Sequence, residues 1–226
     1  MIKVKNVFKS YGNTAVLKGI NIDLYKGTIY GIVGENGAGK TTLFRSIASL
    51  EDYDGKIESD FQNLKNHLGF LQTNPIFMSR ITGWEYLKLL CLARNISLEN
   101  FEEKNIFELP LGQYVETYST GMKKKLALMG LLLQKNEIFI LDEPFNGVDI
   151  HSNIIISEII KKLKSLNKIV LISSHIFSTL SDICDEIHLL KEGSFVKSAK
   201  KEGFKQLDEE MKKFVLGNRV EKLNLE

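Results

Sequence analysis

The stretch GENGAGKTT, residues 34–42, constrains the fold of this chain more than any other part of its sequence. The apolar run TIYGIV (28–33) precedes it and has the pattern of a strand that is buried on both faces. TTLFRSIASL (41–50) follows with helical spacing. The stretch fits G-x-x-x-x-G-K-[ST], in which glycines let the backbone turn so that N–H groups and a helix N-terminus face one point. We therefore expect a strand, a phosphate-binding loop and a helix, in this order.

The residues of this loop have separate expected roles. Lys40 is expected to reach the β- and γ-phosphates of a nucleotide, and the Thr41 hydroxyl to bind Mg²⁺. Thr42 would add a contact to the α-phosphate. The other cofactor-binding positions expected in the loop are Gly34, Asn36, Gly37 and Gly39.

Strand-like and helix-like segments alternate along much of the chain. IFIL (138–141) and KIVLIS (168–173) are typical of buried strands, and HSNIIISEIIKKLKSL (151–166) between them has helical spacing. This alternation predicts a mostly parallel sheet flanked by helices, an α/β fold of the P-loop NTPase type. IKVKNV (2–7) and INIDLY (20–25) alternate polar and apolar residues, which predicts an N-terminal antiparallel β part. Further expected elements are a strand at 67–72, a helix at 177–184 and a hairpin across Lys191–Gly193.

The middle of the chain is predicted to be mostly helical. Helical periodicity recurs in GWEYLKLLCLARN (83–95), in much of LENFEEKNIFELP (98–110) and in TGMKKKLALMGLLLQ (120–134). We interpret roughly residues 80–134 as a helical subdomain inserted into an ATPase domain of residues 1–200. Residues 201–226 are charged and amphipathic and are expected to form a C-terminal helical tail.

Composition excludes several classes of protein. The longest apolar run, LALMGLLL (126–133), is too short to span a bilayer, and the N-terminus lacks the apolar block of a signal peptide. The net charge of +2, from 30 Lys and Arg against 28 Asp and Glu, gives no general attraction to nucleic acid. Cys91 and Cys184 lie in apolar stretches and are expected to be buried packing residues.

EIFILDEP (137–144) places two carboxylates at the end of a predicted buried strand. Ligands bind at the carboxyl ends of strands in such folds, so Asp142 is expected to hold Mg²⁺ and Glu143 to orient and polarise a water. An acid pair here could instead cap a helix or form a surface ion pair. A GTPase is disfavoured because the nearest candidate for an Asn-Lys-x-Asp stretch, residues 167–170, lacks the acid.

Six motifs in order make the chain resemble the ATP-binding cassette (ABC) ATPases over roughly residues 1–200. They are the phosphate loop GENGAGKTT, GFLQ ending in Gln72, YSTGM (118–122), ILDEP, FNGVD (145–149) and SSH ending in His175. YSTGM corresponds to the family signature usually written LSGGQ. It has Tyr118, Thr120 and Met122 where the family has Leu, Gly and Gln, so the geometry of the closed site is expected to differ.

The resemblance implies roles for further residues. Tyr11 would stack on adenine, and Gln72 would touch Mg²⁺ or the attacking water and couple the site to a partner. Ser119 and Gly121 would bind the γ-phosphate of ATP held by a second subunit, and His175 would contact the γ-phosphate of its own site. The catalytic set is thus Glu143, His175 and Gln72, and the metal set is Thr41, Gln72 and Asp142. Without the resemblance, Tyr11 is an ordinary half-exposed aromatic, Gln72 a solvated amide and Ser119 a helix cap.

The resemblance also implies an ATP-hydrolysing subunit of a membrane transporter, with ATP and Mg²⁺ as cofactors. A second ATP-binding subunit, identical or not, and a separate transmembrane permease would be its partners. The signature form S-x-G-M favours export. The chain would be cytoplasmic and peripheral on the inner face of the membrane. The helical subdomain and the Gln72 loop would dock on the permease, with Trp84, Tyr86 and Phe77 available unless they are buried.

A second class stays open at this point, because ABC-type ATPases also act without transport. Members that act on ribosomes usually carry two cassettes and a charged linker, and DNA-repair members carry a long coiled-coil insertion. This chain has one cassette, no sustained heptads and balanced charge, so no direct nucleic-acid partner is expected. A regulatory subunit of a cell-division assembly remains an alternative. An adjacent gene encoding about six apolar spans of 20 residues would favour a transporter.

Overall fold

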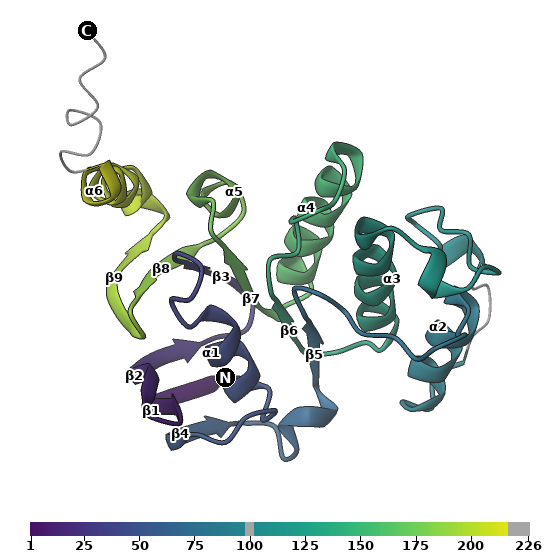
Figure 1. Ribbon diagram of the computed structural model, residues 1–226, viewed down its shortest axis with the longest axis horizontal. Coiled ribbons are helices and arrows are strands. Elements are labelled where there is room, and N and C mark those ends of the chain that lie inside the picture. The colour runs from purple at the N-terminus through teal and green to yellow at the C-terminus, as the bar shows by residue number, and fades with distance from the viewer. Residues whose placement is uncertain (98–101, 217–226) are drawn as a thin grey trace, which may run out of the picture.

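The computed structural model describes residues 1–97 and 102–216, whose strands form two sheets (Figure 1). The smaller sheet is antiparallel, in the order β2-β1-β4. The larger sheet has the order β5-β6-β7-β3-β8-β9 and is parallel except for β9, which pairs antiparallel with β8. The strands are β1 (Ile2–Tyr11), β2 (Thr14–Leu24), β3 (Thr28–Val33), β4 (Asp54–Ser59), β5 (Leu68–Leu71), β6 (Ile138–Leu141), β7 (Ile169–Ser174), β8 (Glu186–Lys191) and β9 (Ser194–Lys200).

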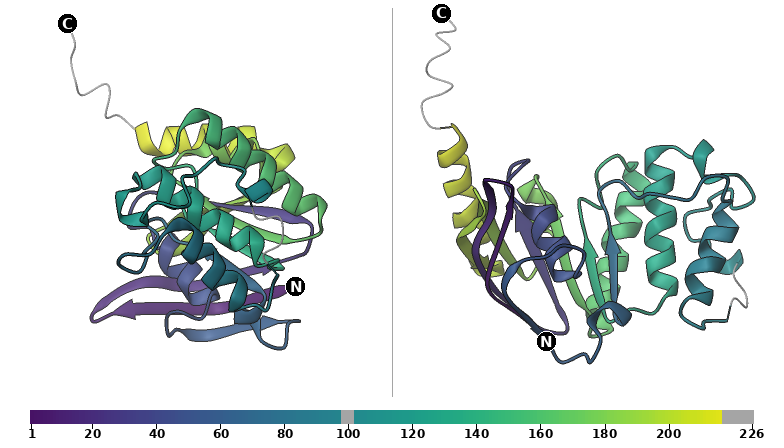
Figure 2. Two further views of the ribbon diagram at one scale, coloured as in Figure 1. Left: turned by 90° about the vertical axis from the view of Figure 1, so that its right-hand side faces the viewer. Right: turned by 60° about the horizontal axis from the view of Figure 1, so that its bottom comes forward.

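Helices cover both faces of the larger sheet. The α-helices are α1 (Lys40–Ile47), α2 (Gly83–Leu92), α3 (Thr120–Leu133), α4 (Ile150–Ser165), α5 (Phe177–Ser181) and α6 (Phe204–Leu216). Short 3₁₀ turns are η1 (Leu64–Asn66), η2 (Glu102–Lys104), η3 (Val115–Thr117) and η4 (Lys201–Gly203). In the right-hand view of Figure 2, α1 lies between the two sheets, where Leu43, Phe44 and Ile47 are fully buried. The predicted α/β core with an N-terminal antiparallel part is confirmed.

A second core lies on the opposite face of the larger sheet, under α3, α4, α5 and α6. Leu126 of α3, Ile156 of α4 and Leu180 of α5 are buried there against the apolar strands. The expected helix in the tail is α6, which buries Phe204 and Leu207, while residues 217–226 lie outside the described part of the chain. The cysteines are buried as expected.

β4, which begins at Asp54, completes the antiparallel sheet. One expectation for local structure was wrong. The helix expected in LENFEEKNIFELP does not continue past Lys104; its first four residues, 98–101, lie outside the described residues. The Asn105 side chain donates to Leu109 O (2.8 Å) and accepts from Leu109 N (3.0 Å). These local hydrogen bonds compete with a helix, which Pro110 could not continue in any case.

α2 and α3 form the helical part of the middle segment and lie to the side of the sheet (Figure 1). A capping box starts α2, because the Thr82 side chain accepts from Glu85 N and the Glu85 side chain accepts from Thr82 N. The helices meet at Gly130, where a Cβ would come within 2.4 Å of Leu90. Phe77 packs edge-on against Tyr86, with ring centroids 4.7 Å apart, so these two aromatic residues serve packing.

Four adjacent strands end at the same edge of the larger sheet. In the pairing register, Leu71 lies opposite Leu141, Leu141 opposite Ile172, and Val33 opposite Ser174. Because these strands are parallel, the segments that follow β5, β6, β7 and β3 come together. The sequence motifs expected to carry the chemistry begin in these segments.

Candidate active site

The phosphate loop connects β3 to α1, and its shape requires glycine at two positions. A Cβ on Gly34 would lie 2.4 Å from the Leu190 carbonyl oxygen of β8. Gly39 has φ +108°, a left-handed conformation, and a Cβ there would lie 3.0 Å from the Val16 carbonyl oxygen. α1 begins directly afterwards at Lys40, so its first N–H groups have no carbonyl partner within the helix. The predicted loop of backbone donors at a helix N-terminus is therefore present.

Lys40 lies beneath this loop and is almost fully buried. Its ammonium donates to Gly34 O (2.7 Å) and Glu35 O (3.2 Å), and it lies 3.5 Å from Glu143 Oε1. The three neighbours hold the cation at the floor of a cavity of about 650 Å³. A cavity of this size with a fixed cation suits a phosphorylated small molecule.

Asp142 follows β6 and accepts hydrogen bonds from three hydroxyl groups. Thr41 Oγ1 and Thr73 Oγ1 donate to Asp142 Oδ2 (2.6 and 2.7 Å), and Ser173 Oγ donates to Asp142 Oδ1 (2.5 Å). Asp142 is fully buried, so these donors offset the loss of water around its charge. The expected pair of Thr41 and Asp142 is thus brought together, and the oxygen set fits a hard cation such as Mg²⁺.

Glu143 points into the same cavity and pairs with His175, which follows β7. His175 Nδ1 lies 3.0 Å from Glu143 Oε2, and Glu143 Oε1 is buried without a hydrogen-bond partner, 3.5 Å from the Lys40 ammonium. The backbone of Glu143 has φ +50°, which is unusual for a residue other than glycine. A buried carboxylate with one oxygen that accepts no hydrogen bond, beside a histidine, is suited to bind and deprotonate a water.

Of the residues expected to serve this chain's own ATP, three lie outside the group that lines this cavity: Gly34, Gln72 and Tyr11. Gln72 is exposed, and the next residue, Thr73, carries the contact to Asp142. Tyr11 ends β1, is 47% exposed and has the Lys9 ammonium 5.1 Å from its ring centre, whereas Val16 of β2 lines the cavity.

Thr73 and Ser173 were missed from the sequence. Each lies at or just after the carboxyl end of a strand in the same sheet as β6, but the register that brings both to Asp142 is a property of the fold.

The signature residues lie at the start of α3, away from the phosphate loop of the same chain. Ser119 is exposed and caps α3 by accepting from Met122 N (3.2 Å). Gly121 is packed so closely that a Cβ would come within 2.7 Å of Gly147 O. Tyr118 is buried and donates to Pro110 O (2.7 Å), and burial raises the pKa of its phenol. The aromatic departure from the family pattern is thus a packing residue.

α3 is also tied to the segment after β6 by two lysines. Lys125 donates to Asp149 Oδ2 (3.2 Å) and Ser152 Oγ (3.0 Å). Hydrogen bonds from the Ser152 backbone and hydroxyl and from Lys125 hold the pKa of the Asp149 carboxyl below its ordinary value. Lys124 is buried and donates to Glu143 O and Asn146 O, both at 2.8 Å. Sequence reasoning missed Lys124, although its spacing of four residues from buried Leu128 places both on one face of the helix.

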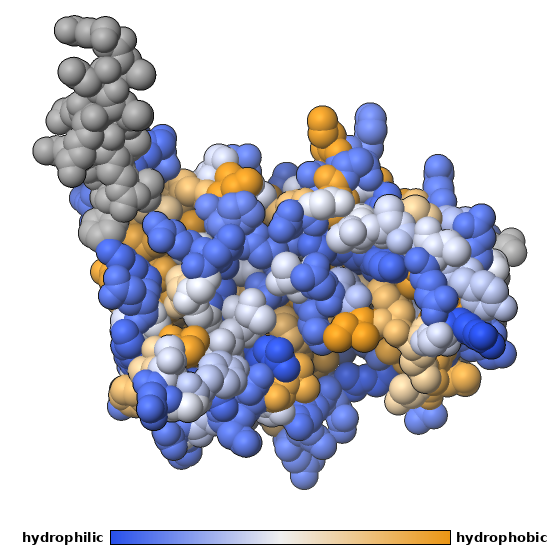
Figure 3. Space-filling view, in the orientation of Figure 1, coloured by the Kyte–Doolittle hydropathy of each residue, from blue (hydrophilic) through white to orange (hydrophobic). Residues whose placement is uncertain are grey.

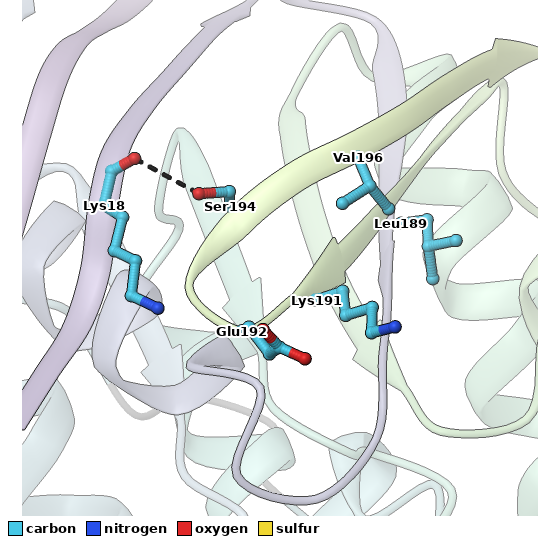
Figure 4. Close-up of a pocket in the computed structure, with 6 residues that line it drawn as sticks. All are labelled: Lys18, Leu189, Lys191, Glu192, Ser194 and Val196. Atoms are coloured by element: carbon cyan, nitrogen blue, oxygen red, sulfur yellow. Dashed lines mark hydrogen bonds between the residues drawn. The ribbon is translucent and has the colours of Figure 1, made fainter.

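A different hollow lies between β2 and the β8–β9 hairpin (Figure 4). Ser194 Oγ donates to Lys18 O across it (3.2 Å), and Leu189 and Val196 form its apolar wall. None of the residues expected to bind nucleotide lines this hollow, so it is not the candidate site. Within residues 1–97 and 102–216, no helix combines the length and the hydropathy needed to cross a membrane.

Known proteins are similar to this chain in sequence and in fold. Residues 17–146 match the model of the ABC transporter family. The bacitracin transport ATP-binding protein BcrA of Enterococcus faecalis is 34% identical over 212 residues, which cover 87% of this chain and 68% of BcrA. The lantibiotic transport ATP-binding protein SrtF of Streptococcus pyogenes is 29% identical over 223 residues, which cover 92% of this chain and 95% of SrtF.

A solved structure shares the fold at lower identity. The ATP-binding cassette MJ0796, described as a dimer in a post-hydrolysis state bound to ADP and Pi, superposes with a TM-score of 0.79 and 22% identity. The match covers 89% of this chain and 99% of MJ0796. With the family match over more than half of its length and a relative above 30% identity, this chain belongs to the ABC transporter family of ATP-binding, ATP-hydrolysing subunits.

Proposed function

We propose that this subunit couples ATP hydrolysis to the export of a substrate through a separate membrane-spanning partner. The observation that carries the proposal is the convergence of the phosphate loop, the Asp142 hydroxyl cluster and the Glu143–His175 pair on one cavity. The names of BcrA and SrtF, which refer to bacitracin and lantibiotic transport, support a transport role over a soluble or regulatory one. They also agree with the preference for export drawn from the signature.

In this proposal, the ATP phosphates occupy the loop between Gly34 and Thr42. Lys40 binds the β- and γ-phosphates with its ammonium, and the backbone N–H groups at the start of α1 bind the remaining oxygens. Thr41, Asp142 and Thr73 would hold Mg²⁺, because oxygen donors are its preferred ligands. The metal ion would neutralise charge on the phosphates.

Glu143 is proposed as the general base. Its Oε1, which accepts no hydrogen bond in the structure, accepts a proton from the attacking water, while its other oxygen stays paired with His175. His175, whose side chain is 44% exposed, can also turn toward the γ-phosphate. Lys40 offsets the negative charge that gathers between the carboxylate and the phosphates.

A second ATP-binding subunit is proposed to complete the site. Ser119 caps its own helix, Gly121 packs against Gly147, and Ser119 is exposed at a helix N-terminus. A hollow beside Glu143 and His175 is lined by Ile150 and Ile154, which are 77% and 59% exposed. Apolar atoms project from the upper end of α4 in Figure 3, which suits burial against another chain.

The membrane partner is proposed to bind at the middle segment. Trp84, 37% exposed, and the exposed Gln72 remain available for this contact. Docking there would hold the subunit at the inner face of the membrane. We also propose the domain division given by the sequence, an ATPase domain of residues 1–200 with a helical tail after it.

The catalytic assignment is tested with Glu143→Gln. The variant should bind ATP, lose at least ~100-fold in turnover because the base is removed, and elute as a dimer with ATP. ATPase assays, equilibrium titration and gel filtration measure these effects. Glu158→Gln is the matched control, since Glu158 is exposed on α4 and pairs with Lys161. Wild-type turnover in Glu143→Gln would exclude Glu143 as the base.

The transport assignment is tested by purifying the subunit from native membranes. A co-purifying polypeptide with several apolar spans, whose removal releases the subunit from the membrane, is the expected result. Co-purification with ribosomes, nucleic acid or a cell-division assembly instead would favour the alternative class. Transport of a peptide antibiotic by vesicles carrying both chains would identify the substrate class.

A further inference from the structure

Lys124 is a charged residue that is only 1% exposed, and the proposed mechanism gives it no role. It lies in the second turn of α3, and its ammonium donates to Glu143 O (2.8 Å) and Asn146 O (2.8 Å). Burying a lysine is unfavourable unless its charge is compensated. Its two acceptors belong to the turn that carries Glu143.

This turn needs an external restraint. Glu143 has φ +50° and precedes Pro144, and both features disfavour the conformation it holds. Within the turn, Asn146 N donates to Glu143 O (3.2 Å). Lys124 binds the same carbonyl from outside, and also the carbonyl at the other end of the turn. The orientation of the Glu143 side chain therefore depends on a contact that α3 makes with the turn after β6.

Electrostatics is consistent with this arrangement. Burial lowers the pKa of the Lys124 ammonium, and the charges of Glu143 and Asp142 oppose that shift. The two carboxylates thus favour the charged form of the lysine that binds the turn of Glu143. Lys123, the neighbouring residue, has only a long contact to Glu116 O (3.5 Å).

We propose that Lys124 is a positioning residue that sets the orientation of the Glu143 carboxylate and connects it to the start of α3. The proposal rests on the function given above, in which Glu143 serves the ATP of its own chain. Ser119 and Gly121, at the start of the same helix, bind the ATP of the second chain. Lys124 therefore connects the two ATP sites of the dimer through one helix. Closure at one site aligns the base at the other.

The test compares Lys124→Met with the control Lys123→Met on the same helix. Met keeps most of the length of the side chain but removes the ammonium, so turnover should fall at least ~10-fold and its cooperativity in ATP should weaken. ATP affinity should stay within about twofold, because Lys124 does not line the cavity. Lys123→Met should match the wild type, and the melting temperature shows whether each variant is folded.

A double-mutant cycle separates positioning from general stability. If Lys124 acts through Glu143, adding Lys124→Met to Glu143→Gln should cause no further loss of turnover. Independent losses that multiply, or wild-type turnover in folded Lys124→Met, would overturn the proposal. Lys124→Gln, which keeps an N–H donor, should recover part of the activity. If Lys124→Met does not fold, Lys124→Gln is judged by the same cycle.

The outcome also separates this proposal from the proposed function. A wild-type subunit that binds ATP but does not hydrolyse it would contradict the function itself. An active wild type with an equally active Lys124→Met would contradict only the role of Lys124.

Discussion

The phosphate loop and the signature each place a glycine at the start of a helix, yet their surroundings differ. Lys40 and Asp142 are buried beside the phosphate loop, and their polar atoms are bound by the loop itself, by Thr41 and by residues at or after the ends of strands. Ser119 and Thr120, at the start of α3, are exposed, and the Ser119 hydroxyl contacts only its own helix. One half of the machinery is assembled inside the chain, and the other half faces outward.

This difference supports the proposal that a second chain completes the site. The first half follows four strands of one sheet, whose pairing register fixes the spacing of the side chains before a ligand binds. The second half is the N-terminal end of α3 in the middle segment, where hydrogen-bond donors are exposed. Substitutions in the two halves should therefore affect different measurements.

Lys40→Ala should give the largest effect, because it removes the buried cation beside the phosphate loop. ATP affinity should fall by ~100-fold or more, the value of a strong charge-assisted hydrogen bond. Isothermal titration measures it. Lys18→Ala is the control, since Lys18 lines the separate hollow of Figure 4. Unchanged affinity in Lys40→Ala would show that the phosphate loop does not bind the nucleotide.

Ser119→Arg should affect the outward half alone. A bulky cation at this exposed cap should prevent ATP-driven dimerisation, while each monomer binds ATP within about threefold of the wild type. Light scattering with ATP measures the dimer, preferably in the Glu143→Gln background, where hydrolysis does not reverse it. Dimers that persist would contradict the assignment of Ser119 to the interface with the second chain.

Thr73→Val tests whether the hydroxyl groups around Asp142 belong to the metal site beside the phosphate loop. It removes one of the donors to Asp142 Oδ2 and keeps the size of the side chain. Turnover should fall roughly 10-fold, and the Mg²⁺ concentration for half-maximal activity should rise. Thr14→Val, at an exposed position of β2, is the control. An equal Mg²⁺ requirement in Thr73→Val would place Thr73 outside the metal site.

Tyr118→Phe should have the smallest effect and concerns stability only. It removes the hydrogen bond to Pro110 O, so the free energy of unfolding should fall by about 1 kcal/mol. ATP affinity should not change, because Tyr118 is buried beside α3 and does not line the phosphate cavity. Urea denaturation and titration measure the two quantities. A loss of dimerisation without a loss of stability would assign Tyr118 to the interface.

Local sequence determined the parts of this protein that depend on neighbouring residues. The phosphate loop, the buried strands β3, β6 and β7 and the acidic pair follow from residue types at short spacing, where backbone geometry is fixed locally. The contact of Thr73 with Asp142 and the contacts of Lys124 with the turn of Glu143 depend on segments that lie apart in the chain. No local pattern specifies such pairs.

By itself, therefore, the sequence determined that this chain is an ABC ATPase and predicted which residues carry the phosphate chemistry. The tertiary structure alone decided which hydroxyls reach Asp142 and which cation holds the turn of Glu143. It also placed Ser119 of the signature on the surface and Lys40 of the phosphate loop in the interior. The physical reason is that hydrogen bonds between distant segments form only after strand register and helix packing have brought those segments within about 3 Å.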